Sequence, residues 1–131
     1  MPVERQSEYE TIYIVRPDAA EEDFAKVSDR VEKIIDAEGG HLLKHDEWGR
    51  RQLAYEIKDK TEGRRFEQGI YHYYRYMVPP GTVQEIERNL RLLDSVLKFL
   101  SVRLDDDLIA AERLARPVEE EVEETEEVAP E

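Results

Sequence analysis

Hydrophobic and polar residues follow two different periods along the first 104 positions of this chain. A period of two, in which apolar and polar side chains alternate as they do in strands, occurs in four stretches: 8–16, 41–57, 70–78 and 96–104. A period of three to four, the spacing of an apolar stripe on a helix, occurs in two stretches: 18–38 and 82–93. The predicted order is strand, helix, strand, strand, helix, strand.

Both helices carry sequence signals of a start. Asp18 is followed three residues later by Glu21, and Thr82 by Glu85, which is the spacing of a capping box. The glycine pair at positions 39 and 40 ends the first helix. We expect both apolar stripes to belong to the core, because a sheet with an apolar face needs helices to cover it.

The third strand, residues 70–78, has apolar residues on both faces, which favours a central place in the sheet. The order of elements predicts an α+β fold of the ferredoxin-like βαββαβ type. Right-handed crossovers then favour a four-stranded antiparallel sheet in the order 4-1-3-2 with both helices on one face. The second and fourth strands become edges, and the other face of the sheet stays free for a partner.

The stretch DEWGRRQLAYEIK, residues 46–58, combines strand-like alternation with a mid-strand glycine and two adjacent arginines. Gly49 predicts a bulge or a close approach of another backbone. Beyond it, Arg51 shares a largely apolar face with Leu53, and Arg50 lies on the polar face. A guanidinium bonds two phosphate oxygens at once, which gives the hypothesis of RNA contact. Two solvated arginines on an ordinary edge strand are the alternative, and this stretch alone does not decide.

Charge is distributed unevenly along the chain. The net charge is −13, but residues 105–131 hold 12 acidic residues against 2 arginines, whereas residues 48–76 hold 7 basic residues against 4 acidic ones. Phosphate binding responds to the local potential within about one Debye length, roughly 8 Å at physiological salt. We expect a short flexible lead over residues 1–7, one RNA-binding domain over 8–104 and a largely disordered acidic tail over 105–131.

The polar loop expected at residues 59–68 (DKTEGRRFEQ) joins the second and third strands, and we expect its tip to be mobile. Arg64 and Arg65 in this loop are candidate RNA contacts on the basis of charge alone.

The residue types speak against catalysis. The chain has no cysteine, and its three histidines lack the spacing of a metal site. No carboxylate pair is placed for acid–base work, and no phosphate-binding glycine motif occurs. We expect no enzyme activity, metal or cofactor. No apolar run reaches the length of a membrane span, so we expect a soluble cytoplasmic protein without membrane contact.

The segment GRRQLAYEIK, residues 49–58, resembles the signature of the bacterial small-subunit ribosomal protein S6 family (bS6). The resemblance covers about residues 8–104, with further matches in the YE pair at residues 9–10, Pro17, the EGG at the end of the first helix and LRLLDSVLKFLSVR at residues 90–103. It implies a ferredoxin-like fold, a structural role in the small subunit, and binding to the central domain of small-subunit (16S) rRNA together with protein S18, as a heterodimer.

Carried over by motif position, the resemblance implies RNA or partner contact at six residues: Trp48, Arg50, Arg51, Arg91, Lys98 and Arg103. Tyr9 is a further candidate. Two departures matter: Glu56 stands where family members commonly have proline, and the loop at residues 59–68 is longer than usual, which puts any carried-over contact there in question.

Two other functions fit the same pattern of elements. One is a ferredoxin-like ligand-binding or enzymatic dimer without nucleic acid, whereas the ribosomal hypothesis predicts a monomer when the chain is isolated. The other is a single-stranded RNA binder that stacks bases on the tyrosines of the third strand, such as Tyr73. That strand lacks the basic-glycine-aromatic sequence of the RNA recognition motif, and tyrosines in strands more often pack in or beside the core.

Overall fold

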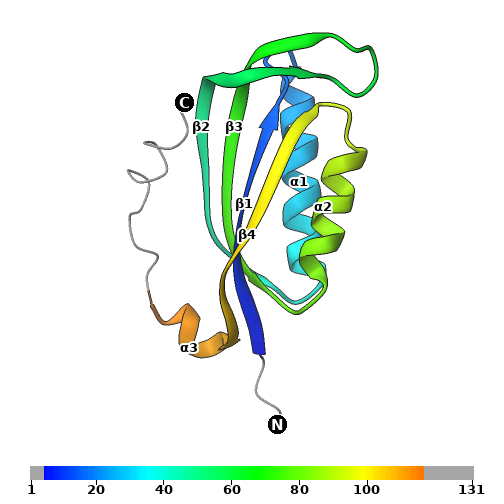
Figure 1. Cartoon of the computed structure of the whole chain (residues 1–131). Coiled ribbons are helices and arrows are strands. Elements are labelled where there is room, and N and C mark those ends of the chain that lie inside the picture. The colour runs from blue at the N-terminus through cyan, green and yellow to red at the C-terminus, as the bar shows by residue number, and fades with distance from the viewer. Residues whose placement is uncertain (1–4, 117–131) are drawn as a thin grey trace.

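The computed structural model of the chain describes residues 5–116, which form one four-stranded sheet with two long helices on one side (Figure 1). The elements follow in the order β1 (Arg5–Val15), α1 (Glu21–Ala37), β2 (His41–Lys58), β3 (Arg65–Val78), α2 (Thr82–Leu92), β4 (Val96–Ile109) and α3 (Ala110–Leu114). The strands lie in the order β2-β3-β1-β4, and all three pairings are antiparallel. The predicted fold class and strand order are confirmed, with β2 and β4 as edges.

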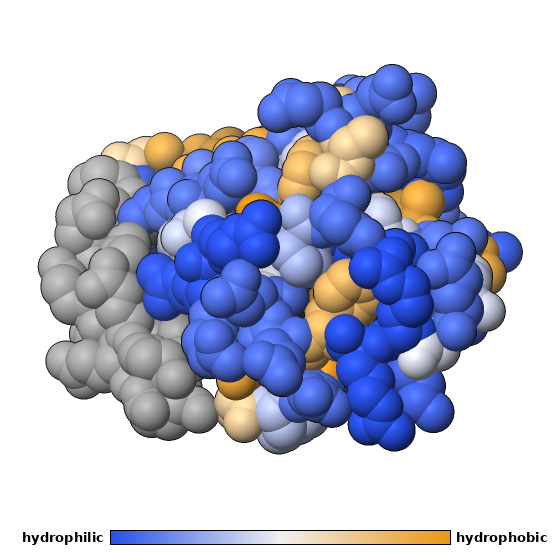
Figure 2. Space-filling model, turned by 90° about the horizontal axis from the view of Figure 1, so that it is seen from above, coloured by the Kyte–Doolittle hydropathy of each residue, from blue (hydrophilic) through white to orange (hydrophobic). Residues whose placement is uncertain are grey.

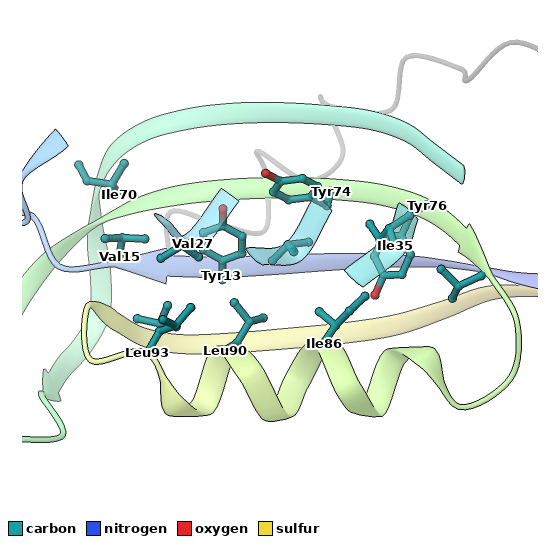
Figure 3. Packing of buried hydrophobic residues seen from close by; sticks show 13 residues of the cluster. Tyr13, Val15, Val27, Ile35, Ile70, Tyr74, Tyr76, Ile86, Leu90 and Leu93 are labelled. Carbon is teal, nitrogen blue, oxygen red and sulfur yellow. The ribbon is translucent and has the colours of Figure 1, made fainter. Parts of the chain in front are cut away.

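The main core lies between the sheet and the two long helices (Figure 3). Even-numbered residues of β3 and odd-numbered residues of β1 point into it. Its largest fully buried side chains include three tyrosines: Tyr13, Tyr74 and Tyr76. Each tyrosine hydroxyl has a hydrogen-bond partner, as buried phenols require. The opposite side of the sheet, which α1 and α2 leave uncovered, is called the open face below.

The helix starts differ from the capping boxes expected from the sequence. α1 is capped at Ala20, whose backbone N–H donates to the carboxylate of Asp23 at 3.3 Å. Asp18 instead accepts hydrogen bonds from two arginine side chains. α2 is capped at Gly81, whose φ of 92° lies in the left-handed region that favours glycine. Thr82 is consequently the first residue of α2.

The bulge predicted at Gly49 is present, because the β2–β3 register shifts between Glu47 and Gly49. Gly49 has a φ of 85°, and a Cβ placed on it would meet no atom within 4 Å. Glycine is therefore needed there for its backbone conformation, and the alternative of a close backbone approach is wrong. A close backbone approach occurs instead at Gly40, where a Cβ would lie 2.8 Å from the carbonyl oxygen of Met77.

The folded domain extends further than residues 8–104. β1 begins at Arg5, and β4 continues through three aspartates to Ile109 before α3. Asp106 accepts a hydrogen bond from Ser7, and Asp107 pairs with Arg5, so polar contacts across β1 hold a stretch of low strand propensity in the sheet. The expected disordered tail at 105–131 is thus wrong for residues 105–114, and its residues 117–131 lie outside the described part.

A buried ion cluster fixes α3 on the open-face side of the sheet (Figure 1). Glu8, only 3% exposed, accepts hydrogen bonds from Arg75 in β3 and from Arg113 in α3. Burial raises the pKa of the Glu8 carboxyl, but these hydrogen bonds outweigh it and hold that pKa below its usual value. The cluster explains why residues that the sequence assigned to the tail belong to the domain.

Candidate RNA and partner interface

The two arginines after the bulge lie on opposite faces of edge strand β2. Arg50 is opposite Ile70, a residue of the main core, and so lies on the helix-bearing side. Its guanidinium donates to Gln68 Oε1 at 3.0 Å and to the carbonyl oxygen of Pro17 at 3.5 Å. Both acceptors are neutral, so the positive charge of Arg50 stays uncompensated at an exposed position.

Arg51 belongs to an aromatic stack on the open face. Trp48 stacks on Tyr73 with the ring centroids 5.3 Å apart, and the Arg51 guanidinium lies 5.2 Å from the Trp48 ring and 6.0 Å from the Tyr71 ring. Cation–π contacts of this kind orient a guanidinium without neutralising its charge. The stack therefore holds Arg51 in a fixed, half-buried position.

The β2–β3 hairpin crosses the end of β1 and reaches β4. Lys98 of β4 donates to the Tyr55 hydroxyl at 2.7 Å and lies 5.0 Å from the centroid of that ring. Beneath this contact is a second core cluster, which takes one or more residues from every strand: Ile14, Leu53, Phe66 and Leu97, with Ile57 and Tyr71 packed against them. Tyr55 itself is 63% exposed, although the alternation had put it with the apolar face of β2.

The strand β3 begins at Arg65, so the β2–β3 loop covers residues 59–64 and is shorter than the 59–68 expected. Arg64 pairs with Asp18 at 3.0 Å, and its guanidinium lies 5.0 Å from the Phe66 ring. Arg16, which sequence reasoning missed, pairs with the same Asp18 and lies 5.1 Å from the same ring. Hydrogen bonding from Arg16 lowers the pKa of Asp18. Viewed from above, this end of the molecule is mostly hydrophilic (Figure 2).

The remaining candidates lie apart from Arg51. Arg91, at the end of α2, lies over the Phe99 ring at 5.4 Å, and Arg103 is 3.8 Å from Asp106. Tyr9 stacks on Tyr76 beside the main core. Arg65 pairs with Glu56, the residue at the family's proline position. The nine candidates thus form several groups and no single patch.

Tyr73 is unsuitable as a platform for stacking bases. It is 6% exposed, its ring packs on Trp48, and its hydroxyl donates to Glu10 at 2.8 Å. Within residues 5–116, no three histidine or carboxylate side chains come together as a metal site would need. In the same part of the chain, no helix is long and apolar enough to cross a membrane.

The sequence of this chain is similar to those of known proteins. The sequence model of the family described as Ribosomal protein S6 matches residues 8–103. The small ribosomal subunit protein bS6 of Geotalea daltonii is 39% identical over 123 residues, 94% of this chain and 90% of that protein. The bS6 protein of Trichlorobacter lovleyi is 42% identical over 99 residues, 76% of each.

Among solved structures, the crystal structure of 30S ribosomal protein S6 from Thermotoga maritima matches with a TM-score of 0.65 and 27% identity, over 85% of this chain and 95% of that one. The C-terminal domain of the Mycobacterium tuberculosis MgtC protein, at 12% identity and a TM-score of 0.53, shares the fold alone.

These matches define the class first: a ribosomal protein, a structural component of translation and not an enzyme. Within that class, the chain belongs to the ribosomal protein S6 family of the small subunit, as the resemblance implied. RNA binding is a general property of this family, and its members are cytoplasmic components of the ribosome.

Proposed function

We propose that this protein binds the central domain of 16S rRNA together with protein S18, as one half of a heterodimer. The observation that carries the proposal is the state of the cations near the β2 edge. Arg50, Arg51 and Lys98 contact neutral acceptors or aromatic rings, and no acidic partner of theirs occurs in the described residues. Their charges are therefore available to an external anion.

Phosphate is the anion that these groups suit. A guanidinium presents a planar fork of donors, and here each one is held in place by neutral neighbours. If about four phosphates are neutralised, the slope of log affinity against log salt should be on the order of −3 to −4. Such contacts position the protein on RNA and carry little base specificity.

The open face supplies a surface suited to S18. Leu100 and Val102 of edge strand β4 are 60% and 42% exposed, and they stand next to Lys98 in the alternation of that strand. Exposed aliphatic side chains in a row on one edge are typical of a protein interface. We assign these residues to the partner and the arginines of β2 to RNA.

The test replaces the two arginines after the bulge. Arg50→Ala/Arg51→Ala should weaken binding to a central-domain rRNA fragment, with S18 supplied, by at least about tenfold and should make the salt slope shallower by about 2. Arg88→Ala is the matched control, because Arg88 is also exposed but pairs with Glu85 on α2. Filter binding over a salt series measures both quantities.

Equal loss in the control, or unchanged affinity in the double variant, would contradict the assignment. Size-exclusion chromatography separates the alternative of a ligand-binding dimer, since we expect the isolated chain to elute as a monomer.

A further inference from the structure

Lys60 ties the β2–β3 loop to the far end of α2. Its ammonium donates to three backbone carbonyl oxygens, those of Leu90 at 3.1 Å, Arg91 at 2.8 Å and Leu93 at 2.8 Å. The last turn of a helix leaves carbonyl groups without N–H partners, and it carries the negative end of the helix dipole. A cation from another element therefore completes α2, and the loop arches over that end of the molecule (Figure 1).

The surroundings of the ammonium support a fixed contact. Burial lowers the pKa of Lys60, while Asp94 nearby opposes this and Arg91 adds to it. The ammonium has thus exchanged part of its water shell for the three carbonyls. The mobility expected for this loop stays a prediction, but these bonds anchor its first residues.

Asp59, the neighbour of Lys60, links this end of the loop to Arg64 at the other end. The buried Asp59 carboxylate accepts the backbone N–H of Arg64 at 2.7 Å, and the backbone N–H of Asp59 donates to the carbonyl oxygen of Arg64 at 2.8 Å. The same carboxylate accepts from the Thr61 hydroxyl at 3.2 Å and from Arg16 at 3.3 Å. The loop is therefore a closed turn whose two ends are hydrogen-bonded to each other.

The exposed end of this turn is the Arg64 guanidinium. It rests over Phe66 and bonds Asp18, and its side chain is 53% exposed. Arg16 shares Asp18 and Phe66 with it, so two guanidinium groups gather around one carboxylate at the surface. Arg16 also pairs with Asp59, so the two guanidinium groups and the two carboxylates balance in charge. Only Nη1 of Arg64 contacts Asp18, and the other N–H donors of this guanidinium suit a phosphate.

We propose that Lys60 is a positioning residue for RNA binding, because it clamps the loop on α2 and thereby presents Arg64 to the phosphate backbone of the rRNA. This inference rests on the proposed function for its ligand.

The experiment is a double-mutant cycle on the full chain, with S18 and a central-domain rRNA fragment. Lys60→Met and Arg64→Ala should each weaken binding about threefold to tenfold, and the double variant should be no weaker than Arg64→Ala, since both changes remove one contact. Lys58→Met is the matched control: Lys58 is exposed in the same hairpin, and its loss should leave the affinity unchanged. Hydrogen exchange at residues 61–64 should quicken in Lys60→Met alone.

Lys60→Arg keeps the charge and the donors, so it should restore most of the affinity and keep the exchange slow. Unchanged binding by Lys60→Met, additive losses in the double variant, or an equal loss in Lys58→Met would overturn the inference while wild-type binding stands. If the wild-type chain shows no salt-dependent RNA binding, the proposed function itself falls.

Discussion

Single side chains in this protein owe their properties to neighbours from distant segments. His72 of β3 is an example: it is 4% exposed, and its two ring nitrogens have no hydrogen-bond partner in the described residues. Its ring stacks on Tyr13 at 4.9 Å and lies within about 6 Å of Phe24 and His45, and Glu47 is opposite it in β2. Burial first, and the His45 charge second, lower the pKa of His72 to about 4.

The first prediction concerns this histidine. In the unfolded chain His72 should take up a proton near pH 6.5, whereas in the folded chain it stays neutral down to about pH 4. Stability should therefore fall as the pH drops from 6.5 to 4, by roughly 3 kcal/mol from this residue alone. In urea unfolding at pH 7 and pH 5, His72→Phe should lose much of this dependence.

His45→Phe is the comparison variant: it removes the smaller of the two causes and leaves His72 buried, so most of the pH dependence should remain. Parallel pH profiles for the wild type and His72→Phe would show that another group sets the dependence.

For the helices and strands, sequence patterns predicted the elements themselves better than the residues at which they end. Alternation identified β1 and β3 as strands, and it holds along both because each residue there pairs with its direct neighbour across a regular ladder. Element ends were less predictable. β4 continues beyond residue 104 because Arg5, Ser7 and Glu8 supply partners, and these contacts join residues about 100 positions apart.

The candidate site was predictable as residue types and unpredictable as an arrangement. The arginine pair stood out by its place after a glycine, but nothing local says that Arg51 lies between Trp48 and Tyr71. Lys60 gave no signal, because a lysine in a polar loop is ordinary and its carbonyl partners belong to α2. Arg16, directly after β1, did give a signal in the sequence, because it is a cation that comes just before Pro17 and Asp18.

At the scale of a strand, we predict that Gly49 sets the direction of both arginines. Gly49→Ala forces a side chain into the left-handed region and should destabilise the fold by about 1–2 kcal/mol. Gly49→Asn should cost less, because asparagine enters that region more readily. Thermal melts rank the two variants, and equal losses would mean that the backbone conformation is not what matters.

For the whole molecule, basic and acidic residues are separated along the chain, and this separation should affect its binding to nucleic acid. The body carries a basic sector in residues 48–76, and residues 117–131 add eight glutamates and no basic residue. Like charge should keep that segment away from RNA and reduce nonspecific binding. Membership of the S6 family makes the domain a component of the small ribosomal subunit.

The prediction at this scale compares two truncations. Deletion of residues 117–131 should leave assembly with S18 and the rRNA fragment intact and raise binding to unrelated RNA. Deletion from residue 112 also removes Arg113, a partner of the buried Glu8, and should cost about 3 kcal/mol or more of stability. Gel shifts with specific and unrelated RNA, beside urea unfolding, distinguish the two; identical behaviour would contradict the role given to Arg113.

The contact between Glu8 and Arg113 also bears on how the protein is made. Its two residues are separated by 105 positions, and β1 receives one of its two neighbouring strands only when β4 has been synthesised. A nascent chain must therefore keep one edge of β1 unpaired, and Glu8 without its second arginine partner, until β4 and α3 have been synthesised. The domain is then completed late, in one step, when β4 and α3 pack against β1. Chaperone binding to β1 should be looked for before that step.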